Sequence, residues 1–120
     1  MNLITNISIR SLALEHIYMF WMEMVALETV GKKTFKSLAP ELFTPTKVLA
    51  ANQGLYNGFL AGGLIWIFFI DNNEWKFYIS VFFLTCILVA GLYGGWTASK
   101  RILYVQALPA FLALILLHLK

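Results

Sequence analysis

Residues 11–30 read SLALEHIYMFWMEMVALETV, a long apolar run whose interior contains Glu15, His16 and Glu23. It is the first of four such runs in a chain of 120 residues, of which 60% are hydrophobic and 12% charged. Soluble proteins contain roughly 45 to 50% apolar and about 25% charged residues, so this composition indicates an integral membrane protein. Ionisable groups are costly in hydrocarbon and usually face a protein interior, which makes these three residues the first candidates for function.

The four runs predict helices at about residues 11–30, 45–70, 74–98 and 102–119. Each helical crossing of a membrane needs about 20 apolar residues, so four crossings use most of the chain and leave room for a single domain, residues 1–120. Short turns join the second helix to the third and the third to the fourth, which makes these pairs antiparallel neighbours. We therefore predict an all-α fold, an antiparallel four-helix transmembrane bundle.

Several residues predict where these helices begin and end. Gly31 is expected to close the first helix in the left-handed conformation, and Pro45 to open the second. The polar turn before the third helix, Asp71, Asn72 and Asn73, offers a capping side chain. Between the first two helices, residues 31–43 interleave lysines with apolar side chains. This pattern is typical of a short segment that lies on a membrane surface.

The distribution of lysine and arginine predicts the orientation of the chain. The side richer in these residues is usually cytoplasmic, so we expect a multi-pass protein of the cell membrane with both termini outside. The asymmetry also accounts for most of the net charge of +3, and no nucleic-acid partner is expected. The inner residues are Lys32, Lys33, Lys36, Lys47, Lys100 and Arg101, and the outer ones are Arg10, Lys76 and Lys120.

Helical geometry indicates which polar side chains share a face. At about 100° per residue, His16 and Glu23 lie on one stripe of the first helix, about 10 Å apart along its axis. In the second helix, Gln53 and Asn57 share a face beside a stripe of small residues, which permits close approach of two backbones. The stripe consists of Ala51, Gly54, Gly58 and Gly62, and the third helix repeats the spacing with Gly91 and Gly95.

We predict an inward-facing polar pocket whose side chains bind a ligand. Asn and Gln also bond across membrane helices as structural contacts worth about 0.6 to 2 kcal/mol, so the amides are equally explained without function. An isolated charge in the middle of a membrane costs at least about 3 kcal/mol, which favours a function for Glu23 and His16. Catalytic residues and cofactors are unknown. The predicted ligand-binding residues are Glu23, Gln53, Asn57, Tyr93 and Gln106, with His16 at the outer end.

Two classes of function compete for this pocket. The first is binding or translocation of a small solute or proton, and translocation would need a homodimer because one subunit has too few polar residues for a water-lined path. The second is a membrane-embedded enzyme that acts on a lipid or isoprenoid by Glu or His acid-base chemistry. The sequence motifs of zinc proteases, phosphate-binding loops and serine hydrolases are absent. No metal site is expected; an ion held by His16 with Glu15 or Glu23 is the less favoured alternative.

Four segments of the chain are similar to a known family. The most specific reads AANQGLYNGFLA at residues 50–61, and shorter ones read LEHIY at 14–18, GLYG at 91–94 and QALPA at 106–110. Together with Glu23, they resemble the DUF1304 family of small bacterial integral membrane proteins. The resemblance spans nearly the whole chain. It implies a four-helix membrane protein of unassigned activity and carries no catalytic residues to transfer.

Overall fold

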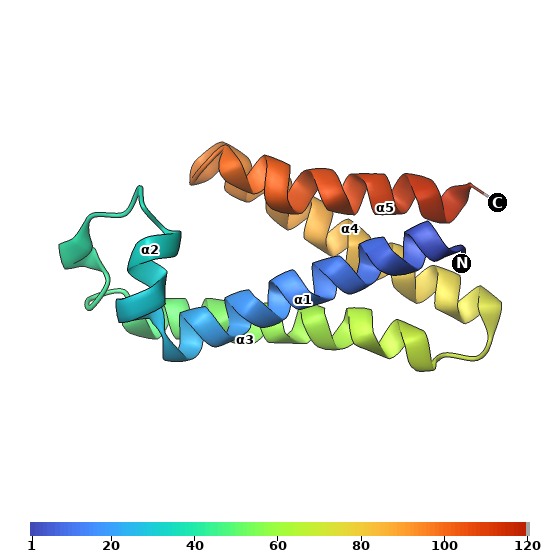
Figure 1. Ribbon diagram of the computed structural model, residues 1–120, viewed down its shortest axis with the longest axis horizontal. Coiled ribbons are helices and arrows are strands. Elements are labelled where there is room, and N and C mark those ends of the chain that lie inside the picture. Colours follow the sequence, from blue (N-terminus) through green and yellow to red (C-terminus); the bar gives the residue numbers. More distant parts are fainter. Residues whose placement is uncertain (120) are drawn as a thin grey trace. The chain divides into compact units, whose positions relative to one another are not determined.

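The computed structural model describes residues 1–119, and Lys120, counted above among the outer charges, lies outside the described residues. Every regular element in residues 1–119 is helical, which confirms the predicted all-α class (Figure 1). The α-helices are α1 (Leu3–Val25), α2 (Lys32–Thr34), α3 (Lys47–Trp66), α4 (Asn73–Thr97) and α5 (Leu108–His118). Two π-helices, η1 (Leu27–Gly31) and η4 (Leu103–Ala107), and two 3-10 helices, η2 (Pro40–Leu42) and η3 (Ile67–Phe69), complete the element order.

The first helix begins eight residues earlier than its apolar run predicts. Asn2 caps it, because its side-chain oxygen accepts hydrogen bonds from the Thr5 backbone N–H at 2.8 Å and the Thr5 hydroxyl at 2.9 Å. Such a cap supplies an acceptor to helix donors that have no partner in the helix itself. Arg10, predicted to lie in an outer loop, is therefore inside α1, with its guanidinium 4.8 Å from the centre of the Phe68 ring.

The end of α1 also differs from the prediction. The helix stops at Val25, Ala26 has φ −120° and ψ 25°, and η1 and α2 then continue the helical path to Thr34. Gly31 does not adopt the expected left-handed conformation, since its φ is −59° and its ψ −38°. It serves close packing instead: a Cβ at this position would lie 3.1 Å from a Leu27 methyl carbon.

The remaining helix boundaries follow the sequence signals more closely. The second long helix, α3, begins at Lys47, two residues after Pro45, and its last predicted turn is the 3-10 helix η3. The Asn72 side chain accepts from the Trp75 backbone N–H at 3.0 Å, which confirms the predicted cap of α4. A short turn links Thr97 to the helical stretch that contains η4 and α5.

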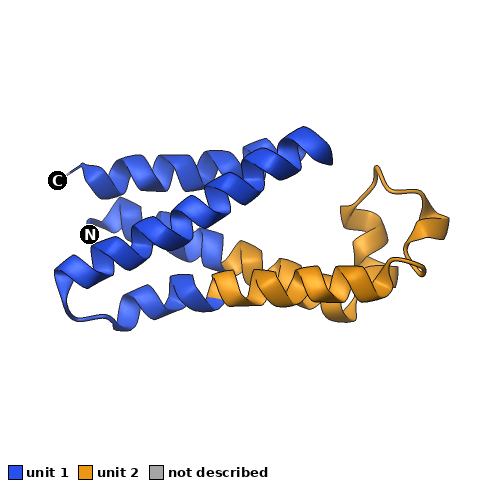
Figure 2. Cartoon of the chain, turned by 180° about the vertical axis from the view of Figure 1, so that it is seen from behind, with its two compact units in different colours: residues 1–13, 62–120 blue, residues 14–61 orange. Residues whose placement is uncertain are grey.

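The described chain divides into two compact units (Figure 2). Unit 1 contains Met1–Ala13 and the residues from Gly62 onward, and unit 2 contains Leu14–Ala61. The expectation that residues 1–120 form one domain stays a prediction. Because α1 and α3 each contribute to both units, the two helices carry the chain from one unit into the other.

In unit 1, α4 packs against η4 and α5 through glycines. A Cβ on Gly91 would lie 2.7 Å from the backbone nitrogen of Ala107, and one on Gly95 would collide with the Leu103 side chain. Gly91 meets Ala107 and Gly95, further along α4, meets the earlier residue Leu103, so α4 and η4 run antiparallel. The predicted close packing at Gly91 and Gly95 is confirmed. Around it lie the fully buried side chains of Leu84, Ile87, Ala110 and Ala113.

In unit 2, α1 and α3 approach each other along part of the predicted small-residue stripe. A Cβ on Gly54 would lie 2.9 Å from the Cβ of Glu23, and one on Gly58 would lie 3.1 Å from the Phe20 ring. Gly62 differs, because a Cβ there would meet nothing within 4 Å. The stripe is therefore a helix contact at Gly54 and Gly58 and is open at Gly62.

This difference gives a paired stability prediction. Gly54→Ala should destabilise the protein by about 1 to 3 kcal/mol, because the new methyl group would force α1 away from α3. Gly62→Ala should be neutral or stabilising by up to about 1 kcal/mol, since alanine is the better helix former and has free space here. Thermal unfolding of both purified variants measures the difference. Equal melting temperatures would mean that α1 and α3 are not in contact at Gly54.

One described helix, α4, is long and apolar enough to cross a membrane, judged by length and composition. The final apolar helix, Leu103–His118, is too short to count as a candidate span by the same measure of length. At this level the structure supports the all-helical class and one candidate membrane span. The four-crossing arrangement is taken up below as a proposal.

Candidate functional site

A buried polar contact between separate helices joins Glu23 of α1 to Asn57 of α3. The Asn57 side-chain amide donates a hydrogen bond of 2.6 Å to a carboxylate oxygen of Glu23. Only 6% of the surface of Glu23 and 8% of that of Asn57 is exposed. The geometry follows from the glycine contact one turn away, since the missing side chain at Gly54 lets the backbone of α3 approach the Cβ of Glu23.

A carboxyl group beside a primary amide has a defined chemical repertoire. The amide supplies donors and one acceptor, and the carboxyl group accepts when ionised and donates when protonated. The carboxyl group can therefore take up or release a proton, and the pair can hold a small molecule that carries both a donor and an acceptor. A pair that served packing alone would not require an ionisable member.

His16 is the other buried ionisable side chain of unit 2, with 1% of its surface exposed. It precedes Glu23 by seven residues on the same continuous helix, so the two are separated by about 10 Å along the axis. Burial of both side chains agrees with the stripe read from the sequence. Glu15, beside His16 in the chain, is half-buried.

The other predicted pocket residues occupy different surroundings. Gln53 is exposed, although it lies one turn from Asn57. Tyr93 is 64% exposed and lines an open apolar groove along α4 with Tyr78, Phe82 and other residues of that helix. Gln106 is half-buried, and its side-chain amide donates to the backbone carbonyl of Ile87 at 3.4 Å.

The structure therefore brings together two of the six predicted residues by direct contact, Glu23 and Asn57. Tyr93 and Gln106 belong to unit 1, whereas Glu23 and Asn57 belong to unit 2. Their membership of one pocket stays a prediction. Within residues 1–119, no group of three or more His, Cys, Asp and Glu side chains is arranged to hold a metal ion.

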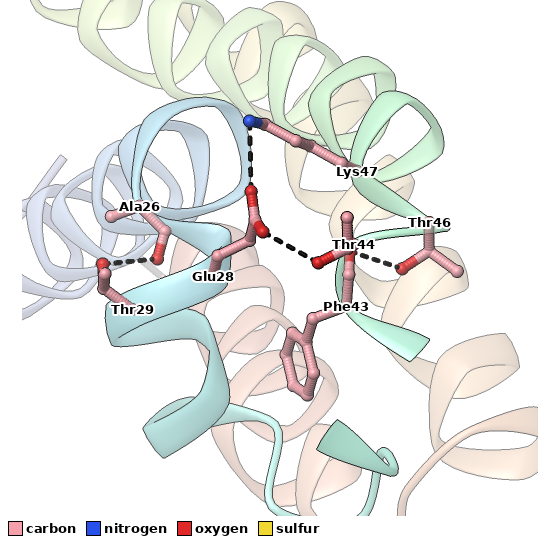
Figure 3. Close-up of polar contacts among 7 residues, drawn as sticks. All are labelled: Ala26, Glu28, Thr29, Phe43, Thr44, Thr46 and Lys47. Carbon is pink, nitrogen blue, oxygen red and sulfur yellow. Dashed lines mark hydrogen bonds and ion pairs between the residues drawn. The ribbon is translucent and has the colours of Figure 1, made fainter. Parts of the chain in front are cut away.

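A second polar cluster, at the cytoplasmic end predicted for α1, was missed by sequence reasoning (Figure 3). The carboxylate of Glu28 accepts a hydrogen bond of 2.8 Å from the Thr44 hydroxyl and forms an ion pair of 3.1 Å with Lys47. The Thr44 hydrogen bond, followed by the hydrogen bond and charge of Lys47, lowers the pKa of Glu28 below its usual value. The sequence signal that could have predicted this cluster is the placement of an acid, Glu28, and a base, Lys47, at the two ends of the connection between α1 and α3.

The described residues form an all-helical protein with an apolar surface and a buried acid–amide contact between two helices. The comparison with known families agrees with the resemblance seen in the sequence. The chain belongs to the DUF1304 family, described as "Protein of unknown function (DUF1304)", whose profile matches residues 11–118.

One relative extends the match over almost the whole chain. The uncharacterized protein YpaA of Lactococcus lactis subsp. lactis (strain IL1403) is 32% identical over 117 residues, which cover 96% of this chain and 97% of that protein. No solved structure matches the chain. The comparisons therefore give membership of a family and leave the activity to be argued from the site.

Proposed function

We propose that this chain is a multi-pass integral membrane protein that binds a small solute or proton at the Glu23 and Asn57 pair. The observation that carries the proposal is the buried hydrogen bond of 2.6 Å between their side chains. An isolated carboxylate charge in the middle of a membrane costs at least about 3 kcal/mol, a cost that an uncharged side chain at the same position would avoid. The presence of an ionisable group at Glu23 is explained if the protein uses its ionisation to bind a solute or proton.

The proposed membrane setting rests on the apolar surface of the helices. Large apolar side chains are exposed on α1, α3, η3 and α4 alike, with 76% of Val25, 73% of Val48, 78% of Phe69 and 84% of Trp96 exposed. Extended exposed apolar surface on a chain this small fits contact with lipid. We propose four crossings, formed by α1, α3 with η3, α4, and η4 with α5, as an antiparallel bundle with both termini outside the cell.

Binding fits one chain better than translocation does. The buried polar side chains in residues 1–119 are too few to line a path across a membrane; they are Thr5, His16, Glu23, Asn57 and Ser80. A translocating protein would therefore need polar groups from a second copy of the chain. In the proposed site, Glu23 takes up and releases the proton or pairs with the solute, and Asn57 orients the carboxyl group.

Infrared titration of the purified protein tests the proposed titrating role. Spectra recorded across pH should contain the carbonyl stretch of a protonated carboxyl group that disappears in Glu23→Gln, because the amide keeps the shape and an acceptor for Asn57 but cannot ionise. Glu15→Gln is the matched control on the same helix and should retain the band. An unchanged titration in Glu23→Gln, in a variant that folds normally, would rule out Glu23 as the proton-binding group.

Cysteine labelling tests the proposed topology independently. In a Cys86→Ala background, a cysteine at Asp71 should react with an impermeant reagent added to intact cells, and a cysteine at Ser37 should react only after lysis. Both positions are exposed in the structure, so accessibility to the reagent depends on the side of the membrane. Asp71 is preferable to Asn72, whose side chain caps α4. The reverse labelling pattern would invert the orientation.

A further inference from the structure

The connection between α1 and α3 is a folded cap rather than a slack loop. We define the cap as residues 27–46. Phe43 is 1% exposed and packs in one cluster with Met22 and Leu27, and Phe35 and Leu38 pack against that cluster. The Tyr18 and Thr34 hydroxyl groups also share a hydrogen bond of 2.8 Å, which ties the helical part of the cap to α1.

Three lysines of this cap point their charge outward. Lys32 and Lys33 lie on α2 and Lys36 follows it, and all three are exposed. Within residues 1–119 none of the three forms an ion pair. The two acids of the cap carry less charge than its three lysines. Glu28 is paired with Lys47 and hydrogen-bonded by Thr44, and the charge of Lys32 also acts on its carboxylate. Glu41 lies exposed on η2.

We propose that Lys32, Lys33 and Lys36 form a binding site for the phosphate headgroups of anionic phospholipids. The inference rests on the membrane setting proposed above, which brings the end of α1 to the depth of the headgroups. Each lysine near the cytoplasmic surface of a membrane is attracted to anionic lipid by about 1 kcal/mol, which is about fivefold in affinity, and long lysine side chains reach the interface. The cap adds a structural reason: its apolar residues pack against the end of α1, which holds the segment with the three exposed lysines in place.

The ion pair at the base of the cap explains why these three lysines, and not Lys47, form the site. Lys47 is held 3.1 Å from the Glu28 carboxylate, so a phosphate group would have to compete with that carboxylate for it. The Thr44 hydrogen bond fixes the same carboxylate from the other side (Figure 3). The cluster thus fastens the cap to α3, and Lys32, Lys33 and Lys36 stay outside its ion pair.

The experiment measures lipid binding by the detergent-solubilised full chain. Native mass spectrometry gives the apparent affinity for phosphatidylglycerol, with phosphatidylcholine as the neutral comparison. Each lysine near the headgroups contributes at most about fivefold to the affinity for phosphatidylglycerol. The triple variant K32Q/K33Q/K36Q should therefore bind phosphatidylglycerol at least about tenfold more weakly than the parent, and its affinity for phosphatidylcholine should not change. The matched control K76Q/K100Q/R101Q removes the same charge elsewhere and should change the affinity less than about twofold.

Additional variants and a competitor distinguish a lipid site from attraction by net charge and from a free-phosphate site. The charge-preserving variant K32R/K33R/K36R should bind phosphatidylglycerol like the parent, and its failure to bind would show that charge is not the determinant. Equal losses in the two glutamine variants would indicate attraction by net charge alone and overturn the site. Full competition by inorganic phosphate would identify a site for free phosphate instead of lipid. Expected cysteine labelling together with unchanged lipid affinity would overturn this inference and leave the proposed topology standing.

Discussion

Gly91→Leu is expected to prevent unit 1 from folding. The Cβ of the new side chain would lie 2.7 Å from the backbone nitrogen of Ala107 and 2.9 Å from its Cα, distances that nonbonded atoms do not tolerate. Backbone atoms cannot rotate out of the way as a side chain can, so α4 and η4 would have to separate. Overpacking of this kind costs typically 1 to 3 kcal/mol, and we expect about 3 kcal/mol or more here because the obstacle is a backbone.

Gly94 supplies the matched control on the same helix. A Cβ there would lie 3.3 Å from the Ile102 side chain, which can shift by a few tenths of an ångström. Gly94→Ala should therefore unfold close to the parent, and Gly91→Ala should already be destabilised by about 1 to 3 kcal/mol. Unfolding in a denaturing detergent, followed by circular dichroism, measures both. If Gly91→Ala unfolds like Gly94→Ala, the close contact of α4 with η4 is absent in solution.

Asn57→Leu should destabilise unit 2 by about 1 to 3 kcal/mol, and by more if Glu23 is ionised. The substitution removes the donor and leaves the Glu23 carboxyl group buried without it, so the full cost of desolvation falls on one side chain. Replacing both members by leucine should restore most of the lost stability, because no buried polar group then lacks its partner.

A double-mutant cycle over Glu23→Leu, Asn57→Leu and the double variant measures this coupling. Unfolding free energies that simply add would mean that the two side chains do not interact in the folded protein. Strong coupling would establish the contact in solution and make the variants suitable for the infrared titration, since a structural loss could then be separated from the loss of a titrating group.

Local signals in the sequence predicted the parts of the fold that depend on local chemistry. The polar turn of Asp71, Asn72 and Asn73 predicted a cap for α4, which Asn72 provides, because a capping side chain acts within one turn. Gly91 and Gly95 predicted a close helix contact because small residues four apart lie on one face. The start of α1 was missed, since the cap at Asn2 stands well before the apolar run used to define the helix.

Interpretation of Gly31 failed for a different reason. Glycine is common at helix ends because it tolerates the left-handed conformation, and this prior says nothing about neighbours that approach its Cα. Here the Leu27 side chain takes the space, and the helical path continues past the glycine. Such a contact depends on how η1 packs, and a local sequence pattern does not predict that packing.

The candidate site was predicted in part. The seven-residue spacing correctly indicated that His16 and Glu23 share a face, and both are buried. Gln53 was grouped with Asn57 by the same argument, yet Gln53 is exposed. Helical periodicity shows which side chains share a face, and does not show which of them a neighbouring helix covers: α1 covers Gly54 and Asn57 and leaves Gln53 exposed.

The division of the chain has a consequence for biosynthesis. Unit 2 is one uninterrupted stretch, Leu14–Ala61, so all of its segments exist once residue 61 has been added to the growing chain. Unit 1 joins Met1–Ala13 to the residues from Gly62 onward, and it cannot be completed until the last helix is synthesised. Chains fold from the N-terminus as their units emerge. The contact between Glu23 and Asn57 can therefore form before unit 1 is complete, and Met1–Ala13 must wait for partners that are synthesised later.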